Sequence, residues 1–371
     1  MPLSERDLID VARLARIFAD AEMLTLERVL SALARGVDDP AWEIDVLARL
    51  QRLTAQTLDD LGTDAAQYVA AIRERLAALY ASGEAAIFAE IGAAGIGKPE
   101  AIEDSRRRAV VLALAREMND AASAAGRGML RAVDDVYRRI VGETVELVAS
   151  RGLSRRDALR TATRTFLSRG IPSFTDESGR RWSIQSYVDM ATRTGYANAQ
   201  IRGHEDALTA ARLDLCIVQP GPRACDICDE WARKVLARNG RAGTITTTNR
   251  LTGKPMQVKV DGTLAEARAA GFQHPNCRCS LRAFIPGATE KATIQRPPWD
   301  GEGYQRQQQQ RGIERAIREA KTQALVAESV GDTKTAERAR ARVKAAQQRL
   351  RDHLAANPEL KRRNDREQVI R

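Results

Sequence analysis

The feature that most constrains this fold is a helical period of apolar residues through the first 150 residues. Leu8, Val11, Ala15 and Phe18 recur at three- and four-residue spacing after a helix-start signal at Ser4. Aromatic residues make up only 4% of the chain, while alanine and leucine are abundant. Any core must therefore come from aliphatic packing between helices. The sequence predicts a mainly α-helical protein with a long N-terminal helical region.

Glycine and proline mark where these helices are expected to stop. The first helix should run to about Arg35, before a turn that ends at Pro40. The next helical stretch is expected to break near Gly62, and the one over 101–150 has a weak spot at Gly126. Between them, the glycine-rich stretch 91–100 resembles a phosphate loop only superficially, because no strand precedes it and proline replaces the Ser or Thr. We expect it to be a connection between helices.

After Gly152 the pattern changes to shorter elements, which predict a small central α+β domain. One more helix is expected at 154–168, then two short extended pieces around a turn at Ser178 and Gly179, then a helix from Ser183 to Ala210. The elements expected beyond it are strand 215–218, helix 226–238, strand 256–260, helix 264–270 and strand 280–285.

A proline-rich linker around Pro297 leads to a charged helical tail that is expected to fold back at Gly331. Residues 302–371 hold 17 Lys+Arg and 10 Asp+Glu, so +7 of the net charge of +10 lies there. This face is either simply solvated or contacts DNA or an acidic protein surface. The candidate contact residues are Arg311, Arg315, Arg318, Lys321, Arg338, Arg340, Arg342, Lys344 and Arg349.

The predicted domains are a helical one at 1–150, the α+β one at 151–290, and the linker and tail at 291–371.

Four of the five cysteines lie in two short clusters, CDIC at Cys225 and Cys228 and HPNCRC at His274, Cys277 and Cys279. Two cysteines two residues apart in a turn can converge on one tetrahedral metal ion. Cys277 and Cys279 point the same way in an extended backbone, and the turn after His274 can return its ring toward them. The sequence therefore offers five candidate ligands for the four positions of a zinc ion.

Other interpretations of this cluster stay open. Forty-five residues separate Cys228 from His274, more than in compact zinc fingers, so the same residues could be reduced thiols buried in a small core. A redox role is disfavoured by Asp226 beside the first thiol, and catalysis by Cys277 with His274 lacks an orienting partner. We therefore predict no enzymatic activity and no small-molecule substrate.

The remaining sequence features predict an ordinary cytoplasmic origin. The longest apolar run, at 109–115, is far shorter than the roughly 20 residues of a membrane helix, and the N-terminus lacks a secretory signal. We predict no contact with a membrane, and synthesis in the cytoplasm with reduced cysteines. Cys216 is expected in the core, whereas His204 and His353 are expected at the surface.

Four segments of the chain resemble the minor capsid proteins of tailed bacteriophages, the Mu-F-like head morphogenesis group. They are SGRRWSIQSYVDMATRTGYANA (178–199), PRACDIC (222–228), HPNCRCSLRAFIPG (274–287) and YQRQQQQRGIERAIREAK (304–321). The resemblance covers roughly residues 150–325, and its most specific piece is HPNCRC. Arg193, Thr194 and the five Cys and His residues are its structural signatures, and the family brings no catalytic residues.

The resemblance implies a virion structural protein present in few copies, inside the capsid or beside the portal vertex. Its partners would be the portal protein and/or the major capsid protein, with packaged double-stranded DNA as a further contact. Its role would be in head assembly and in DNA packaging or ejection. The alternative is a zinc-stabilised nucleic-acid-binding protein outside the virion, suggested by the same cluster and the pI of about 9.7.

Overall fold

The computed structural model describes residues 4–37, 39, 42–97, 99–169, 174–175, 181–182, 184–221, 224–275, 277–289, 302–329 and 331–367. The chain divides into two units, and each unit is assembled from three separate segments. Unit 1 consists of Met1–Val11, Tyr68–Asp120 and Met190–Gln305, and unit 2 of Ala12–Gln67, Ala121–Asp189 and Arg306–Arg371. The three-domain division predicted from the sequence stays a prediction.

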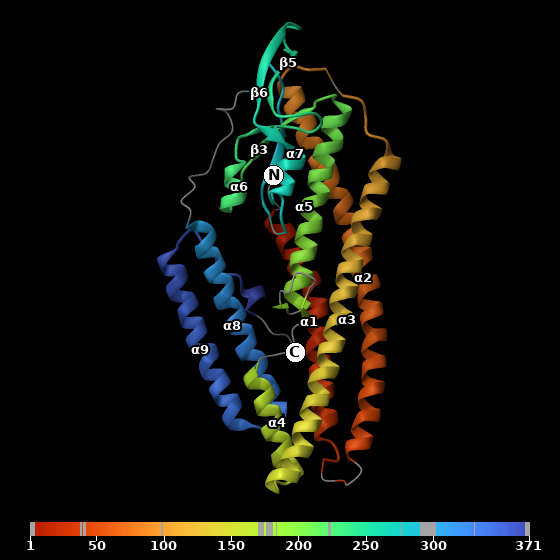
Figure 1. Cartoon of the computed structure of the whole chain (residues 1–371), viewed down its shortest axis with the longest axis vertical. Helices are drawn as coiled ribbons and strands as arrows, with labels where there is room; N and C mark the ends of the chain where they lie inside the picture. Colours follow the sequence, from red (N-terminus) through yellow and green to blue (C-terminus); the bar gives the residue numbers. More distant parts are fainter. Residues whose placement is uncertain are drawn as a thin grey trace. The chain divides into compact units, whose positions relative to one another are not determined.

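Four helices make up the first half of the chain, which confirms the prediction of a mainly helical protein (Figure 1). They are α1 (Glu5–Ala34), α2 (Trp42–Ala93), α3 (Asp104–Arg151) and α4 (Arg155–Arg169). The predicted connection at 91–100 is confirmed. The predicted break at Gly62 and weak spot at Gly126 are wrong, because α2 and α3 run through them. One glycine costs a helix only about 1 kcal/mol, which the packing of a long helix outweighs.

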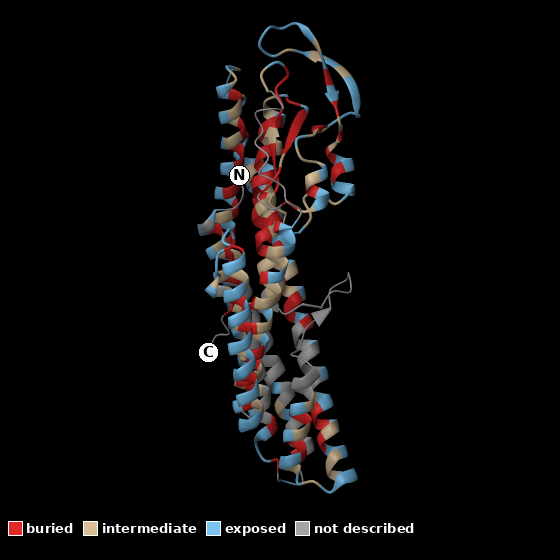
Figure 2. Ribbon diagram, turned by 90° about the vertical axis from the view of Figure 1, so that its left-hand side faces the viewer, coloured by how far each residue is buried: buried red, intermediate tan, exposed pale blue. Residues whose placement is uncertain are grey.

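Helix α5 (Ile184–Ala210) is the central helix of unit 1 from Met190 onward. It is buried on several sides, as the red residues along it show in Figure 2. Toward α2, the hydroxyls of Tyr68 and Thr192 lie 2.8 Å apart, and the hydroxyl of Tyr80 donates to Asp206 at 2.7 Å. These hydrogen bonds satisfy polar groups that the close helix packing removes from water.

A four-stranded sheet follows α5, with the strand order β7-β4-β3-β8. Its strands are β3 (Leu215–Gln219), β4 (Val235–Ala237), β7 (Gly262–Thr263) and β8 (Ser280–Ala283). The central strand β3 pairs antiparallel with β4 and β8, and β4 pairs parallel with β7. Cys216 and Val218 of β3 belong to the core cluster shared with α2 and α5, while Ile217 belongs to a second cluster with β6 (Pro255–Val260). Both faces of β3 are therefore covered, which explains its unbroken apolar run.

Two expectations about the central domain need correction. The predicted helix 226–238 is wrong: α6 (Asp226–Glu230) is a single short turn, and β4 follows it. Arg233 takes a left-handed backbone conformation (φ 63°) that ends the helical path, and its N–H joins the carbonyl of Val218. The sequence also missed β5 (Gly243–Thr248), which pairs antiparallel with β6.

Other predicted elements of this part are confirmed. The strand at 256–260 corresponds to β6, and the helix at 264–270 to α7 (Leu264–Ala269). Helix α7 begins with a reciprocal capping box between Thr263 and Glu266, which satisfies two of its first N–H groups. Strands β1 (Phe174–Thr175) and β2 (Arg181–Trp182) pair antiparallel as expected. Their predicted turn lies outside the described residues, as do the linker prolines.

In unit 2, α8 (Gly303–Ser329) and α9 (Thr333–Ala356) form an antiparallel hairpin, as predicted for the tail (Figure 1). Asp332 caps α9 by accepting the N–H of Thr335 at 3.1 Å. Ile317 of α8 packs with Ala346 and Leu350 of α9. A short 3-10 turn, η2 (Asn364–Arg366), ends the described chain.

One part of α2, Gln67–Ala93, is a 27-residue stretch long and apolar enough to cross a membrane by those two measures alone. Its apolar residues Ile72, Leu76 and Ile87 are completely buried inside unit 1. Its Glu84 is paired with Arg107 of α3 at 2.6 Å. This is the environment of a core helix, so the apolar composition is explained by packing.

Candidate metal centre

Two short arms of unit 1 carry the five candidate ligands. The first arm is the start of α6, where Cys225 is the N-cap residue and Cys228 lies one turn later with 1% of its surface exposed. The second arm is the turn after α7, closed by a hydrogen bond from the N–H of Cys277 to the carbonyl of His274 at 2.9 Å. The first arm thus presents two cysteines, and the second presents a histidine and two cysteines.

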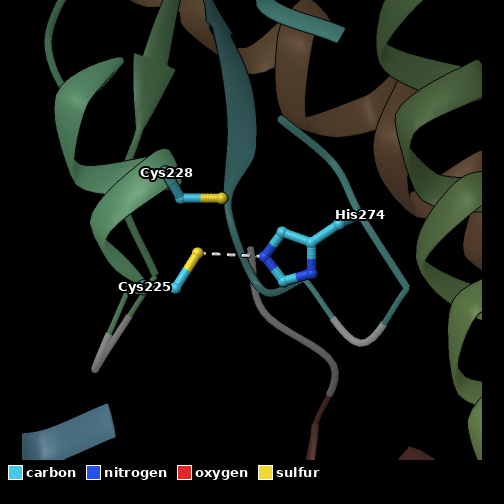
Figure 3. A group of neighbouring side chains, drawn as sticks. All are labelled: Cys225, Cys228 and His274. Atoms are coloured by element: carbon cyan, nitrogen blue, oxygen red, sulfur yellow. Dashed lines mark hydrogen bonds between the residues drawn. The ribbon is translucent and has the colours of Figure 1, made fainter. Parts of the chain in front are cut away.

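The side chains of the two arms meet across the gap between them. The Sγ of Cys225 lies 3.0 Å from Nε2 of His274, and Figure 3 shows the ring nitrogen directed at that sulfur. The Sγ of Cys228 lies 3.4 Å from the Sγ of Cys277. Two groups of potential ligands, one with Cys225 and His274 and one with Cys277 and Cys279, share Cys228, and the ligand atoms within each group lie within 4.8 Å of one another.

These distances distinguish a metal site from a disulfide. A disulfide needs two sulfurs about 2.05 Å apart, and all five cysteines are free thiols. A tetrahedral zinc ion with Zn–S bonds of about 2.3 Å separates its sulfur ligands by about 3.8 Å. The observed separation of 3.4 Å between Cys228 and Cys277 is much closer to the second value. The cluster is therefore compact enough to hold an ion after small side-chain adjustments.

The ring of His274 is oriented for binding through Nε2. Its Nδ1 lies 2.8 Å from the carbonyl oxygen of Pro275, and a carbonyl can only accept. Nδ1 is therefore the donor, and in this tautomer the lone pair lies on Nε2, the atom that faces Cys225. Metal-binding histidines are commonly oriented by such a second hydrogen bond.

Backbone N–H groups support the sulfurs of the second arm. The N–H of Cys279 donates to the Sγ of Cys277, and the N–H of Gly221 donates to the Sγ of Cys279, each at 3.4 Å. Hydrogen bonds from Cys228 and Cys279 lower the pKa of Cys277 and favour its thiolate, the form that binds metals. The hydrogen bond to Cys277 raises the pKa of Cys228, so Cys228 keeps its proton more readily than Cys277 does.

Gly221 is a contributor that the sequence did not single out. A Cβ atom there would lie 2.5 Å from the carbonyl oxygen of Arg278, so only glycine lets the backbone of the loop after β3 approach the second arm. The glycine between two prolines in QPGPR was the available signal, but it is typical of any loop. Trp231 packs against the same core, with the amine of Lys234 4.4 Å from the centre of its ring.

One cysteine and two histidines lie outside the cluster, and they differ in how far they are buried. Cys216 is fully buried, as predicted, and burial raises the pKa of its thiol to about 12. The prediction that His204 lies at the surface is wrong, because only 1% of it is exposed. His353 is half-buried, and its Nε2 lies 2.9 Å from the carbonyl of Arg306. Polar neighbours in the sequence misled both predictions, since they occupy other helix faces.

The nine basic tail residues divide into two sets. On α8, Arg318 donates to the carbonyl of Arg366 and Lys321 to that of Glu367, so both bind other parts of unit 2. Arg311 is half-buried and Arg315 is exposed. The five on α9 are exposed, although Arg340 pairs with Glu328 and Arg342 donates to Gln323. The exposed set is therefore Arg315, Arg338, Arg340, Arg342, Lys344 and Arg349.

Comparison with protein families matches residues 8–355, nearly the whole chain, to Phage minor capsid protein 2. Searches of curated proteins and of solved structures give no match. The family match agrees with the resemblance found in four segments of the sequence and extends it over the helical N-terminal half. A structural family of this kind points to a non-enzymatic protein that is located in the virion and interacts with other virion components. The chain belongs to the phage minor capsid protein 2 family.

Proposed function

We propose that this protein is a minor capsid component inside the head, at or near the portal vertex, that supports head assembly and DNA packaging or ejection. Its partners are the portal protein and/or the major capsid protein. The observation that carries this proposal is the family match over residues 8–355. The long helices α2 and α3, of 52 and 48 residues, supply extended surfaces suited to packing within a larger assembly.

Cross-linking mass spectrometry of purified particles tests the location. The expected result is a few copies per particle, with cross-links from lysines of this chain to the portal or to adjacent major capsid subunits. Absence of the protein from particles that contain all other head proteins would contradict the proposal. That outcome would favour the alternative of a zinc-stabilised nucleic-acid-binding protein acting outside the virion.

A structural zinc ion belongs to the same proposal. Its ligands are assigned as Cys225, Cys228, His274 and Cys277, whose side chains meet between the arms at 3.0 Å and 3.4 Å. Cys279 is assigned a supporting role, since its N–H donates to Cys277 and its sulfur accepts from Gly221. Four protein ligands leave no open position, so the ion would tie the two arms together without catalysing a reaction.

Metal analysis of protein purified without chelators tests the ligand set. About one zinc ion per chain is expected. Substitution of any one of the four assigned ligands by serine should remove most of the bound zinc. Cys279→Ser and the core control Cys216→Ser should keep the metal. Wild-type protein with less than about a tenth of an equivalent of zinc would contradict the site itself. Zinc loss in Cys279→Ser but not in Cys225→Ser would contradict the ligand assignment alone.

The basic face of α9 is proposed to contact packaged double-stranded DNA. Helix α9 holds seven Lys and Arg but only two acidic residues, Glu337 and Asp352. Arg338, Lys344 and Arg349 are exposed. Such a face attracts the phosphate backbone independently of base sequence, by releasing counterions.

A further inference from the structure

The hairpin formed by β5 and β6 lies in a stretch from which acidic residues are missing. Residues 231–260 contain seven Lys and Arg and no Asp or Glu. Forty-nine acidic residues in 371 would place about four in a segment of this length. The segment belongs to unit 1, whereas the basic tail belongs to unit 2. It is therefore a second concentration of positive charge, separate in sequence from the tail.

The hairpin has two chemically different faces because its strands alternate. Ile245 pairs with Val258, and the side chains of Ile245, Val258 and Val260 pack in the core cluster that includes Ile217 of β3. The other face holds exposed residues: Thr244, Thr246, Thr248, Pro255, Gln257 and Lys259. The apolar face thus anchors the hairpin, and the hydroxyl, amide and amine groups belong to exposed residues. Much of the hairpin is accordingly pale blue in Figure 2.

Three exposed cations line this hairpin: Arg241 before β5, Lys254 before β6 and Lys259 within it. No side chain of these three forms an ion pair with a carboxylate among the described residues. Arg250 at the turn differs, because it donates to the carbonyl of Ala211 at 3.2 Å and its N–H bonds to Pro286. Arg250 therefore holds the turn in place, and the other three remain available to a ligand.

We propose that the outward face of the β5–β6 hairpin binds the phosphate backbone of duplex DNA. Lys259 on this face supplies charge, together with Arg241 and Lys254, which are exposed just before the two strands. The threonine hydroxyls and the Gln257 amide supply hydrogen bonds, and these are the groups that usually contact phosphates and sugars. Strands of six residues extend about 20 Å, and the major groove of DNA is wide enough to admit a two-stranded ribbon. The contact is independent of base sequence.

The composition of the face favours DNA over an acidic protein as its ligand. Protein interfaces depend on buried aromatic, methionine or arginine anchors. The outward face has no aromatic residue, and Leu251 at the turn is the one large apolar side chain exposed on the described hairpin. The face instead offers cations and hydrogen-bond donors without a carboxylate that would repel phosphates, and such a surface favours binding of a polyanion.

Binding of the full chain to random-sequence duplex DNA, measured against salt concentration, tests the proposal. In the triple variant Arg241→Gln, Lys254→Gln, Lys259→Gln, the slope of log K against log salt should fall by about 3, with an affinity loss on the order of 10- to 100-fold near 0.1 M salt. The matched control removes three exposed cations from α2 and α3 of the same unit: Arg73→Gln, Arg108→Gln, Arg116→Gln. The control should change the slope much less.

A second triple variant separates the contribution of α9 to DNA binding from that of the hairpin. It carries Arg338→Gln, Lys344→Gln and Arg349→Gln, and it is measured alone and in combination with the hairpin triple variant. The hairpin effect should appear with either version of the tail. A hairpin triple that binds DNA like the control overturns the proposal, whatever the tail variant does. The single variant Lys254→Gln, at the exposed end of β6, guards against misfolding and should still lower the slope by about 1. An unchanged slope in a folded Lys254→Gln variant would also count against the site.

Discussion

At the scale of single residues, three glycines determine how closely α5 packs in unit 1. A Cβ on Gly203 would lie 2.1 Å from the carbonyl oxygen of Tyr80, and one on Gly83 would lie equally close to that of Gln200. Gly195 faces Met118 of α3, where an added Cβ would lie 2.2 Å from the sulfur. The backbones of α2 and α5 therefore approach at positions where no side chain fits. The sequence predicted the helix that contains Gly195 but did not single out this glycine.

Alanine substitutions at two helical glycines should have opposite effects on stability. Gly203→Ala should lower the free energy of unfolding by about 1–3 kcal/mol or more, because the added methyl group forces the helices apart. Gly142→Ala, on α3, meets no atom within 4 Å and should stabilise by about 0.5–1 kcal/mol. Chemical denaturation of both variants provides the measurement. Equal effects of the two substitutions would show that α2 and α5 are not closely packed.

His204 should make the protein less stable in acid. Burial lowers its pKa to about 4, and neither ring nitrogen has a hydrogen-bond partner among the described residues. An unfolded histidine has a pKa near 6.5, so between these values the unfolded chain binds the proton and the folded one does not. Stability is therefore fully present above about pH 6.5 and falls toward pH 4, by on the order of 3 kcal/mol for this group.

Comparing the stability of the wild type and His204→Leu across this pH range isolates the contribution of the histidine. The variant should lose that part of the pH dependence while other groups keep theirs. Parallel curves for the two proteins would mean that the imidazole becomes protonated in the folded state without penalty. His353, which is half-buried and bonded to a carbonyl, provides a comparison position.

At the scale of elements, the apolar spacing and the turn residues of the sequence predicted most helices. They did not predict where a short helix such as α6 ends. The bounds of α1, α4, α5 and α7 and the α8–α9 hairpin follow from apolar spacing and from glycine or proline at the ends. Residues 226–238 look helical because Val235 and Leu236 continue the apolar spacing, yet both belong to β4. Pairing with β3 decides their conformation, and a local pattern contains no information on that distant partner. The same reason explains why β5, with its run of threonines, was missed.

The exposed face of α9 gives the prediction for the tail. In the full chain, Arg338→Gln, Lys344→Gln, Arg349→Gln should weaken binding to duplex DNA and lower the salt slope by about 3, since each cation releases about one counterion. Arg318→Gln is unsuitable as a DNA-binding variant, because that side chain bonds to Arg366 and Ser186 and its loss should lower stability instead. Filter binding or anisotropy at several salt concentrations measures the slope. An unchanged slope would mean that the charge of α9 is only solvated.

At the scale of the whole molecule, the division into units does not follow the order of the chain. Helices α2 and α3 each contribute one end to unit 1 and the other to unit 2. Sequence patterns locate boundaries by changes in composition, and no such change occurs at Gln67 or Asp120 inside these helices. Only contacts between residues distant in the chain, such as Arg75 with Asp7 or Arg164 with Asp332, define the units.

The sequence by itself determined the helical class, the ligand types of the Cys/His cluster and the concentration of charge in the tail, because periodicity, side-chain chemistry and net charge are local properties. The tertiary structure decided which atoms meet. It brought Cys225 to His274 and Cys228 to Cys277 across the intervening strands, and it buried His204. It also turned the threonines of β5 and Lys259 outward on one face. These outcomes depend on strand pairing and helix packing between distant segments, which no local pattern specifies.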